Sequence, residues 1–262
     1  MPGMAAPGGE GAPQPGLSPA LRLVLAVSLD GRLAPAQGGA AQLGGVGDRW
    51  ALEEALAWAD ACLIGAQTLR LHGTTCLIHH DELLQRRCAA GRPPQPIALV
   101  VSRSGRLSPA LPFFAQPLER WLLHGPQGEA GAPGFHRQLP LAPWPVVLPQ
   151  LAAAGLRRVV VLGGAQLAAS LLAARQVQEL QLTLCPRVLG GPHGWIPLQG
   201  RDGGRCEGWV EGLVEAPVAG DDASAQLAQA LSGQAWELLA HTALEGGELL
   251  LRYRRSMGEQ PG

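Results

Sequence analysis

A β-branched run that ends in two glycines and continues as a helical pattern constrains the fold of this chain most. The stretch VVVLGGAQLAASLL spans Val159 to Leu172. A strand that leads through glycines into a helix gathers free backbone N–H groups and the positive end of the helix dipole at one point. This arrangement suits a pyrophosphate, although LGGAQL is not the G-x-G-x-x-G fingerprint. A tight strand-to-helix turn with close packing also explains the glycines.

Two further strand ends carry related features. In ACLIGAQTL, Gly65 permits close approach of the backbone and Thr68 offers a hydroxyl in the first helical turn. Two strand ends of this kind at one crevice suggest an extended ligand with several polar groups. The third strand end, VVSRSGRL, is a candidate grip for a phosphate monoester, formed by Ser102, Arg103, Ser104 and Arg106. A capping threonine and a solvated turn are the structural alternatives.

The order of expected elements indicates the fold class. Strands are expected over LRLVLAVSLDG, ACLIG, PIALVVS, RWLLH, PVVL, RRVVVL and QVQELQLTLCPRVLGG. Helices are expected from Asp48 as N-cap, over PQLAAAGL with Pro149 in the first turn, and over AQLAASLLAAR. The C-terminal segment predicts an antiparallel hairpin that turns at Gly246 and Gly247. Strands that alternate with helices before a hairpin favour an α/β fold with a mixed sheet.

The domain organisation follows from composition. Residues 1–20 are rich in Gly and Pro and predict a disordered tail, while residues 21–256 predict a single domain. The segments 125–145 and 190–224 are long Gly/Pro-rich loops, either flexible or placed around a site.

Composition also excludes several classes of function. The formal net charge of -1 provides no field for nucleic acid, and no apolar run is long enough for a membrane span. The chain has no Lys, so Schiff-base chemistry is excluded. The five cysteines form no C-x-x-C pair, and the N-terminus has no secretory pattern, so we expect a reduced, cytoplasmic protein. No metal is expected, because His72, Cys76, His79 and His80 lack metal-site spacing.

The strand ends, taken in order, resemble the pyrimidine reductase family of riboflavin biosynthesis. The resemblance rests on AVSLDGRLA, ACLIGAQTL, VVSRSGRL and VVVLGGAQLAASLL, followed by QELQLTLCPRVLGG. It covers roughly residues 21 to 191 and the terminal hairpin. This family is usually seen as the C-terminal domain of the bifunctional deaminase-reductase. Because no zinc-deaminase H-x-E motif precedes Leu21, we expect this chain to carry the reductase step only.

The resemblance implies a fold, a reaction and a set of site residues. The fold is dihydrofolate-reductase-like, with a mixed, mostly parallel sheet flanked by helices. The reaction is the NADPH-dependent reduction of 5-amino-6-(5-phosphoribosylamino)uracil to its ribityl form, by a homodimer. The implied cofactor-binding residues are Ala26, Gly65, Thr68, Ser102, Arg103, Gly163, Gly164, Ala165, Gln166 and Leu167. Ser28, Gln42 and Leu162 are expected on the substrate side, and His72 is the candidate catalytic acid.

Some positions depart from the family pattern on the substrate side. Leu162 stands where a Glu is common, His72 where an Asp is common, Val24 where a Lys is common and Leu56 where an Arg is expected. Each lost charge-assisted hydrogen bond costs about 1.5 to 3 kcal/mol. Two alternatives therefore stand beside the riboflavin reductase, namely a reductase of another heterocycle such as a pterin and a cofactor-binding paralogue without catalysis.

Overall fold

The computed structural model describes residues 18–126, 132–196 and 223–256, and side chains throughout these ranges except at 223–226. Its strands are β1 (Ala20–Ser28), β2 (Ala61–Gly65), β3 (Ile97–Ser102), β4 (Arg120–His124), β5 (Arg137–Pro140), β6 (Arg158–Val161), β7 (Glu179–Cys185), β8 (Trp236–Ala243) and β9 (Leu249–Arg255). Its helices are α1 (Val46–Trp58), α2 (Ala66–His72), α3 (Asp81–Ala89), the 3-10 turn η1 (Pro112–Ala115), α4 (Trp144–Ala153), α5 (Ala165–Ala173) and α6 (Ala223–Leu231).

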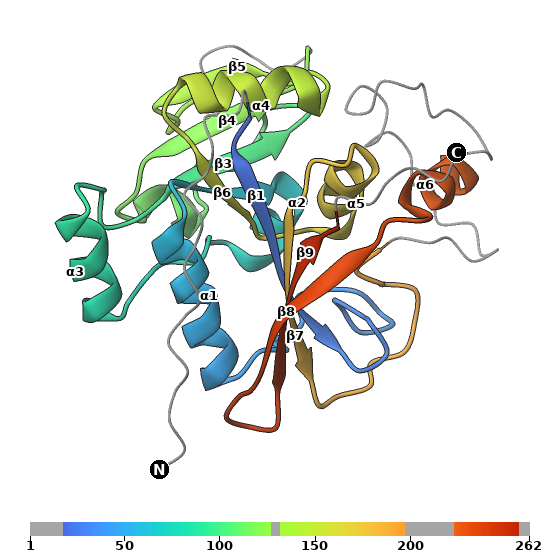
Figure 1. The fold of residues 1–262 in the computed structure, drawn as a ribbon. Helices are drawn as coiled ribbons and strands as arrows, with labels where there is room; N and C mark the ends of the chain where they lie inside the picture. Colours follow the sequence, from blue (N-terminus) through green and yellow to red (C-terminus); the bar gives the residue numbers. More distant parts are fainter. Residues whose placement is uncertain (1–17, 127–131, 197–222, 257–262) are drawn as a thin grey trace.

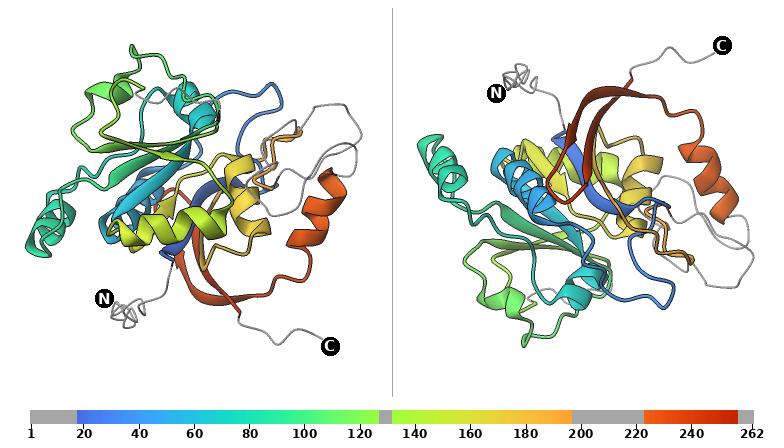
Figure 2. Two further views of the ribbon diagram at one scale, coloured as in Figure 1. Left: turned by 90° about the horizontal axis from the view of Figure 1, so that it is seen from above. Right: turned by 90° about the horizontal axis from the view of Figure 1, so that it is seen from below.

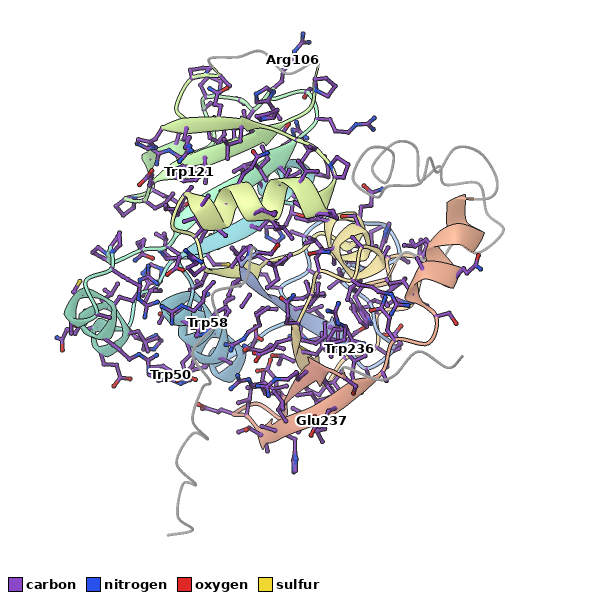
Figure 3. All side chains as sticks on the ribbon, turned by 45° about the horizontal axis from the view of Figure 1, so that its top comes forward. Trp50, Trp58, Arg106, Trp121, Trp236 and Glu237 are labelled. Atoms are coloured by element: carbon purple, nitrogen blue, oxygen red, sulfur yellow. The ribbon has the colours of Figure 1, made fainter. Side chains whose placement is uncertain are left out.

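In the described residues these strands form one sheet in the order β5-β4-β3-β2-β6-β1-β7-β9-β8 (Figure 1). The strands from β5 to β7 pair in parallel, whereas β9 is antiparallel to both β7 and β8. In Figure 3, Trp121 of β4 lies at the upper left and Trp236 of β8 lies below it and to the right. The mixed, mostly parallel sheet with its C-terminal hairpin confirms the predicted fold class.

At the centre of the sheet, β1 separates from β6 before it separates from β7. β1 pairs with β6 only as far as Leu23 and Val161, but it pairs with β7 as far as Ser28 and Cys185. In open α/β sheets, ligands bind outside the carboxyl ends of strands at such a division. The predicted strand ends therefore meet at one edge.

Helices cover both faces of the sheet. Helices α4 and α5 lie together on one face, and α1 lies on the other (Figure 2). On the α4 and α5 face, Leu23, Trp144 and Leu167 belong to one buried cluster. On the α1 face, Val24, Ala55 and Val160 form a smaller cluster with Ala59. Residues 21–25 of β1 are all buried, because successive side chains of a strand point to opposite faces and both faces are covered by helices.

Several expected elements are confirmed, and others are wrong. The strands ACLIG, PIALVVS, RWLLH and RRVVVL, the helix AQLAASLLAAR and the terminal hairpin are confirmed. PVVL is wrong as a strand, because it lies within α4 with Pro149 inside the helix rather than in its first turn. The predicted long strand is limited to β7. The predicted loop 125–145 contains β5 and the start of α4, and α3 and α6 were not predicted.

The start of α1 corrects a second expectation. Asp48 is not the N-cap, since the helix begins at Val46 with Gly45 as the N-cap and has no side-chain cap of its own. The Glu248 carboxylate instead accepts hydrogen bonds from the backbone N–H of Gly45 at 2.6 Å and of Asp48 at 3.2 Å. Glu248 is 4% exposed. A residue from the β8–β9 hairpin therefore accepts hydrogen bonds from backbone N–H groups at the beginning of α1.

The end of α1 is held by another distant charge. The buried Arg87 of α3 donates to the carbonyls of Leu56, Ala57 and Ala59, at 3.0 Å to the first. Burial lowers the pKa of Arg87 to about 10, which leaves it charged at neutral pH. The guanidinium lies at the negative end of the helix dipole.

The predicted tail over residues 1–17 and most of the segment 190–224 lie outside the described residues. None of the described helices is long and apolar enough to cross a bilayer.

Candidate active site

The glycine pair after β6 is packed by the protein itself. Gly163 has φ +89, and a Cβ there would lie 2.9 Å from Leu25 Cδ2. A Cβ on Gly164 would lie 2.8 Å from Thr68 Oγ1. A left-handed backbone and close neighbours both require glycine at this turn. The tight-turn explanation of the sequence therefore holds, and it is compatible with a ligand at the helix that follows.

The N-terminus of α5 has no side-chain cap. The Gly164 N–H donates to Thr68 Oγ1 at 3.1 Å, and the first helical hydrogen bond runs from Ala168 N–H to the Gly164 carbonyl at 3.0 Å. The N–H groups of Ala165, Gln166 and Leu167 precede that bond. Such groups form an anion site at a helix N-terminus. Five of the predicted cofactor residues and Thr68 are thus brought together.

The end of β3 adjoins the end of β4. Ser102 is buried, whereas Arg103 is exposed. The Gly125 N–H donates to the carbonyls of Ser102 and Arg103 at 3.3 and 3.1 Å, and a Cβ on Gly125 would lie 2.7 Å from the Arg103 oxygen. The Arg70 guanidinium donates to the Arg106 carbonyl at 2.8 Å, which ties α2 to this strand end.

The end of β1 is fixed by a charged turn. Ser28 Oγ donates to Asp30 at 2.6 Å and accepts from the Arg32 N–H at 2.9 Å. The hydrogen bond from Ser28, followed by that from the Leu189 N–H, lowers the pKa of Asp30 to about 2. Ser28 is 0% exposed, so its hydroxyl holds the turn rather than facing a ligand. The other expected substrate residue in this region, Gln42, is exposed and its carbonyl accepts from Arg187 at 3.2 Å.

Ala26 is a partly exposed residue of β1 on the α1 face of the sheet. Ala26 is partly exposed in a strand whose residues from 21 to 25 and from 27 to 28 are buried. It is register-paired with Thr183 of β7, and Thr183 hydrogen-bonds to the partly buried carboxyl of Asp48. Burial, the largest cause, and the nearby Glu248 charge raise the pKa of Asp48. The sequence did not identify Asp48, Thr183 or Glu248 as site residues, because they come from three distant segments.

The apolar departures from the family pattern lie in two adjoining clusters on the α1 face of the sheet. Val24 is 7% exposed and lies in one cluster with Leu162, and Leu56 is fully buried in the adjoining cluster that Leu162 also contacts. The Leu162 N–H donates to the Leu63 carbonyl at 2.9 Å, continuing the parallel ladder. These positions therefore serve as core in this chain.

The histidines and cysteines of the segment 72–80 do not form a cluster of their own. His72 is exposed at the end of α2. His80 Nδ1 lies 2.7 Å from the buried Glu53 carboxylate, which also accepts from the His79 N–H at 2.7 Å. Burial alone would raise the pKa of Glu53, but these hydrogen bonds lower it. In the described residues no group of three or more His, Cys, Asp or Glu is placed to hold a metal ion.

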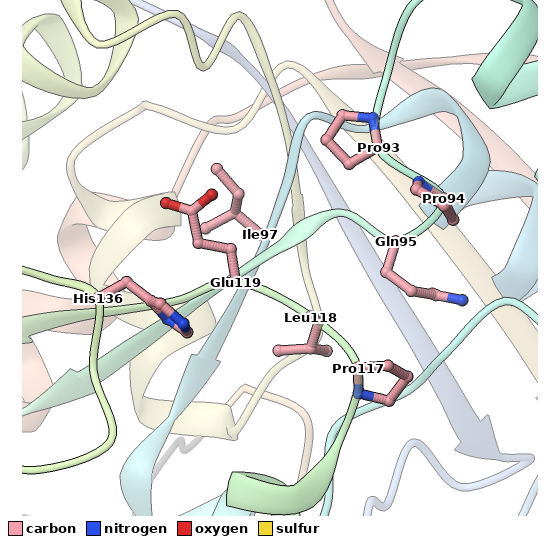
Figure 4. Close-up of a pocket in the computed structure, with 8 residues that line it drawn as sticks. All are labelled: Pro93, Pro94, Gln95, Ile97, Pro117, Leu118, Glu119 and His136. Atoms are coloured by element: carbon pink, nitrogen blue, oxygen red, sulfur yellow. The ribbon is translucent and has the colours of Figure 1, made fainter.

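A pocket at the opposite edge of the sheet is separate from these strand ends (Figure 4). Its lining includes Ile97, Glu119 and His136, which lie at the amino ends of β3, β4 and β5. Glu119 accepts from Trp121 Nε1 at 2.6 Å, and His136 Nδ1 accepts from the Arg120 N–H at 3.0 Å. Its polar groups are thus used within the protein.

Comparisons with known proteins agree with this architecture. Residues 19–205 match the model of the RibD C-terminal domain. The riboflavin biosynthesis protein RibD of Haemophilus influenzae is 26% identical over 179 residues, which are 66% of this chain and 48% of that relative. The chain therefore spans about half the length of the curated relative that it matches.

Solved structures share the fold at low identity. A pyrimidine reductase-like protein from Corynebacterium diphtheriae has a TM-score of 0.65 at 18% identity, with 92% of this chain and 93% of that chain covered. The riboflavin biosynthesis reductase Rib7 of Saccharomyces cerevisiae has a TM-score of 0.60 at 14% identity, with 93% and 92% covered. The match to the family model spans well over half of the sequence, and the chain belongs to the RibD C-terminal domain family.

Proposed function

We propose that the protein is an NADPH-dependent reductase of the riboflavin pyrimidine reductase type. The observation that carries this proposal is the uncapped N-terminus of α5, which begins directly after the glycine turn and beside Thr68. Its family relatives include a riboflavin biosynthesis protein and a riboflavin biosynthesis reductase. The reaction would be reduction of 5-amino-6-(5-phosphoribosylamino)uracil to the ribityl compound.

The residues at the strand ends fit the cofactor. The N–H groups of Ala165, Gln166 and Leu167 would bind the pyrophosphate, as backbone donors do at helix N-termini. Arg103 is exposed at the end of β3 and would contact the 2′-phosphate by its guanidinium. Ala26, which is partly exposed between buried residues of β1, would lie beside the nicotinamide. The bound nicotinamide would supply the hydride.

A second candidate substrate is a flatter, less charged heterocycle such as a pterin. The observation that favours it is the packing of Val24, Leu56 and Leu162 into the core under α1. Apolar side chains there offer no hydrogen bond to a phosphorylated open sugar.

A homodimer is the assembly that we propose. Strand β8 is the outer strand of the described sheet, and every residue after Trp236 in it is exposed. Leu238 and Leu239 are 48% and 36% exposed. An exposed edge strand with apolar side chains readily pairs with another chain. Glu237, next to Trp236 at the start of β8, is labelled in Figure 3. Sedimentation should give twice the chain mass, and Leu238→Lys should shift it to the monomer.

The test combines binding and turnover. NADPH at about a hundred times its dissociation constant should stabilise the protein by about 2.7 kcal/mol, which raises the melting temperature by a few degrees. Addition of the phosphoribosylaminouracil should then oxidise NADPH, as followed by absorbance. A thermal shift without oxidation would favour the other heterocycle or a cofactor-binding protein without catalysis. No shift with NADPH or NADH would refute the proposed function.

A further inference from the structure

We propose that Asp48 is the proton donor of the reduction and that Glu248 is its positioning residue. This inference rests on the proposed function, and it assigns to Asp48 the role for which the sequence suggested His72. Its basis is the juxtaposition of the Asp48 carboxyl, the Thr183 hydroxyl and the partly exposed Ala26 near the carboxyl edge of the sheet.

The position of Asp48 follows from the register of the sheet. Ala26 and Thr183 are paired across β1 and β7, and neighbouring strands lie about 4.8 Å apart. Ala26 points to the α1 face, because it is two residues from Val24, which packs under α1. Thr183 points to the same face because it is the register partner of Ala26. The hydrogen bond from Thr183 therefore places the Asp48 carboxyl one strand from Ala26.

Close packing fixes the Asp48 side chain. A Cβ on Gly44 would overlap the carboxyl group of Asp48. On the other side, Glu248 holds the backbone of Asp48 and Gly45 through both of its oxygens. A Cβ on Gly47 would lie 2.7 Å from Leu244 Cβ, so the hairpin packs against the same turn. The orientation of the carboxyl is thus set by its surroundings.

The charges around Asp48 separate the roles of the two acids. Glu248 accepts two backbone N–H donors, whereas the Asp48 carboxyl accepts the Thr183 hydroxyl. Burial, followed by the Glu248 charge, outweighs the Thr183 hydrogen bond and Arg49 and raises the pKa of Asp48. Burial raises the pKa of the nearby thiols of Cys76 and Cys185 to about 11 and about 12, so both thiols are neutral at pH 7. A carboxyl group whose pKa is raised by burial is suited to act as a proton donor.

His72, the donor suggested by the sequence, has no comparable burial. It is exposed at the last residue of α2, whereas Asp48 is partly buried and hydrogen-bonded to Thr183. A donor must come within hydrogen-bond reach of the atom that it protonates.

The chemical step balances with one proton from Asp48. In the open form of the substrate, the reacting carbon is joined to nitrogen by a double bond. As the hydride forms the new C–H bond, the π electrons move to nitrogen and the Asp48 carboxyl transfers its proton there. The Asp48 O–H bond breaks, an N–H bond forms, and solvent protonates the carboxylate again.

Asp48→Asn tests the donor, and Glu54→Gln is the matched control because Glu54 is an exposed acid on the same helix. In single-turnover experiments the wild-type rate should fall as the pH rises through the pKa of Asp48, since a donor must be protonated. Asp48→Asn should be at least about 100-fold slower, without that pH dependence. It should bind NADPH as the wild type does, and Glu54→Gln should keep the wild-type profile. Glu248→Gln should move the decline in rate to lower pH.

A carboxyl ¹³C NMR titration gives a readout that does not depend on turnover. The oxidised nicotinamide carries a positive charge and the reduced one does not, so the pKa of Asp48 should be lower with NADP⁺ than with NADPH. Equal pKa values in the two complexes, or an Asp48→Asn variant as fast as wild type, would overturn the inference and leave the proposed function intact. Failure of either nucleotide to bind would refute the proposed function and this inference with it.

Discussion

Helices α1 and α5 both start at the carboxyl edge of the sheet, and neither has a capping side chain of its own. At α1 the Glu248 carboxylate fills the N-terminus and is almost completely buried. At α5 the N-terminal turn is bordered by a glycine pair and the hydroxyl of Thr68. Both ends attract negative charge for the same reason.

This difference between α1 and α5 shows that the attraction of a helix N-terminus for negative charge can serve two purposes. A buried carboxylate at α1 joins the C-terminal hairpin to the first helix. In the part of the chain that the structure describes, the N-terminus of α5 has no side-chain cap and no acidic residue in its first turn, so its attraction for anions remains for a phosphate group. The predictions below alter each end in turn.

Glu248→Ala should cause the largest effect. It removes the charged acceptor of the Gly45 and Asp48 N–H groups, and a hydrogen bond to a charged group contributes about 1.5 to 3 kcal/mol, so the free energy of unfolding should fall by about 3 kcal/mol. Urea unfolding measures this loss, and Glu245→Ala, at an exposed site in the same hairpin, is the control. Added sulfate should restore part of the stability by binding the vacated helix end. Equal stability of the two variants would show that Glu248 does not stabilise the start of α1, and the contrast between α1 and α5 would be wrong.

Ala165→Glu should make α5 resemble α1. A carboxylate in the first turn would repel the pyrophosphate, and we expect the dissociation constant for NADPH to rise about 100-fold, equivalent to about 2.7 kcal/mol. The same charge should stabilise the free protein by about 0.3 to 1 kcal/mol through the helix dipole. Titration calorimetry and urea unfolding measure the two opposite effects, with Ala165→Gln as the uncharged control. Unchanged affinity would place the cofactor elsewhere.

Thr68→Val should produce the smallest change. The variant keeps the shape of the side chain but removes the acceptor for the Gly164 N–H, which costs about 1 kcal/mol. NADPH affinity should fall about 5-fold, as measured by fluorescence titration. The control is Thr74→Val at an exposed position in the same region. If both valine variants bind NADPH equally, Thr68 does not shape the turn.

Local patterns in the sequence predicted most of the sheet and the glycine turn. The β-branched run before Gly163 and the apolar period of α5 are short-range signals, and both elements form as expected. PVVL has the same β-branched character but lies in α4. That helix starts at Trp144, which is buried in the core and donates a hydrogen bond from its indole N–H to the Ser170 hydroxyl. Tertiary burial overrides intrinsic preference there.

The part of the site around Asp48 could not be predicted in the same way. Asp48 looked like a helix cap from its position before an apolar period, and only the structure shows that Glu248 takes that role. Thr183 appears in the sequence as one residue of an apolar strand. Contacts between residues far apart in the sequence leave no periodic pattern, so pattern reasoning cannot identify them.

The hydrogen bond between Gly45 and Glu248 spans 203 positions of the chain. During synthesis, the first helix therefore leaves the ribosome long before the acid that completes it. Loop closure over such a separation is entropically costly, and folds rich in long-range contacts form slowly. We infer that α1 stays frayed at its start in the nascent chain and that the final hairpin is a late, committing step of folding.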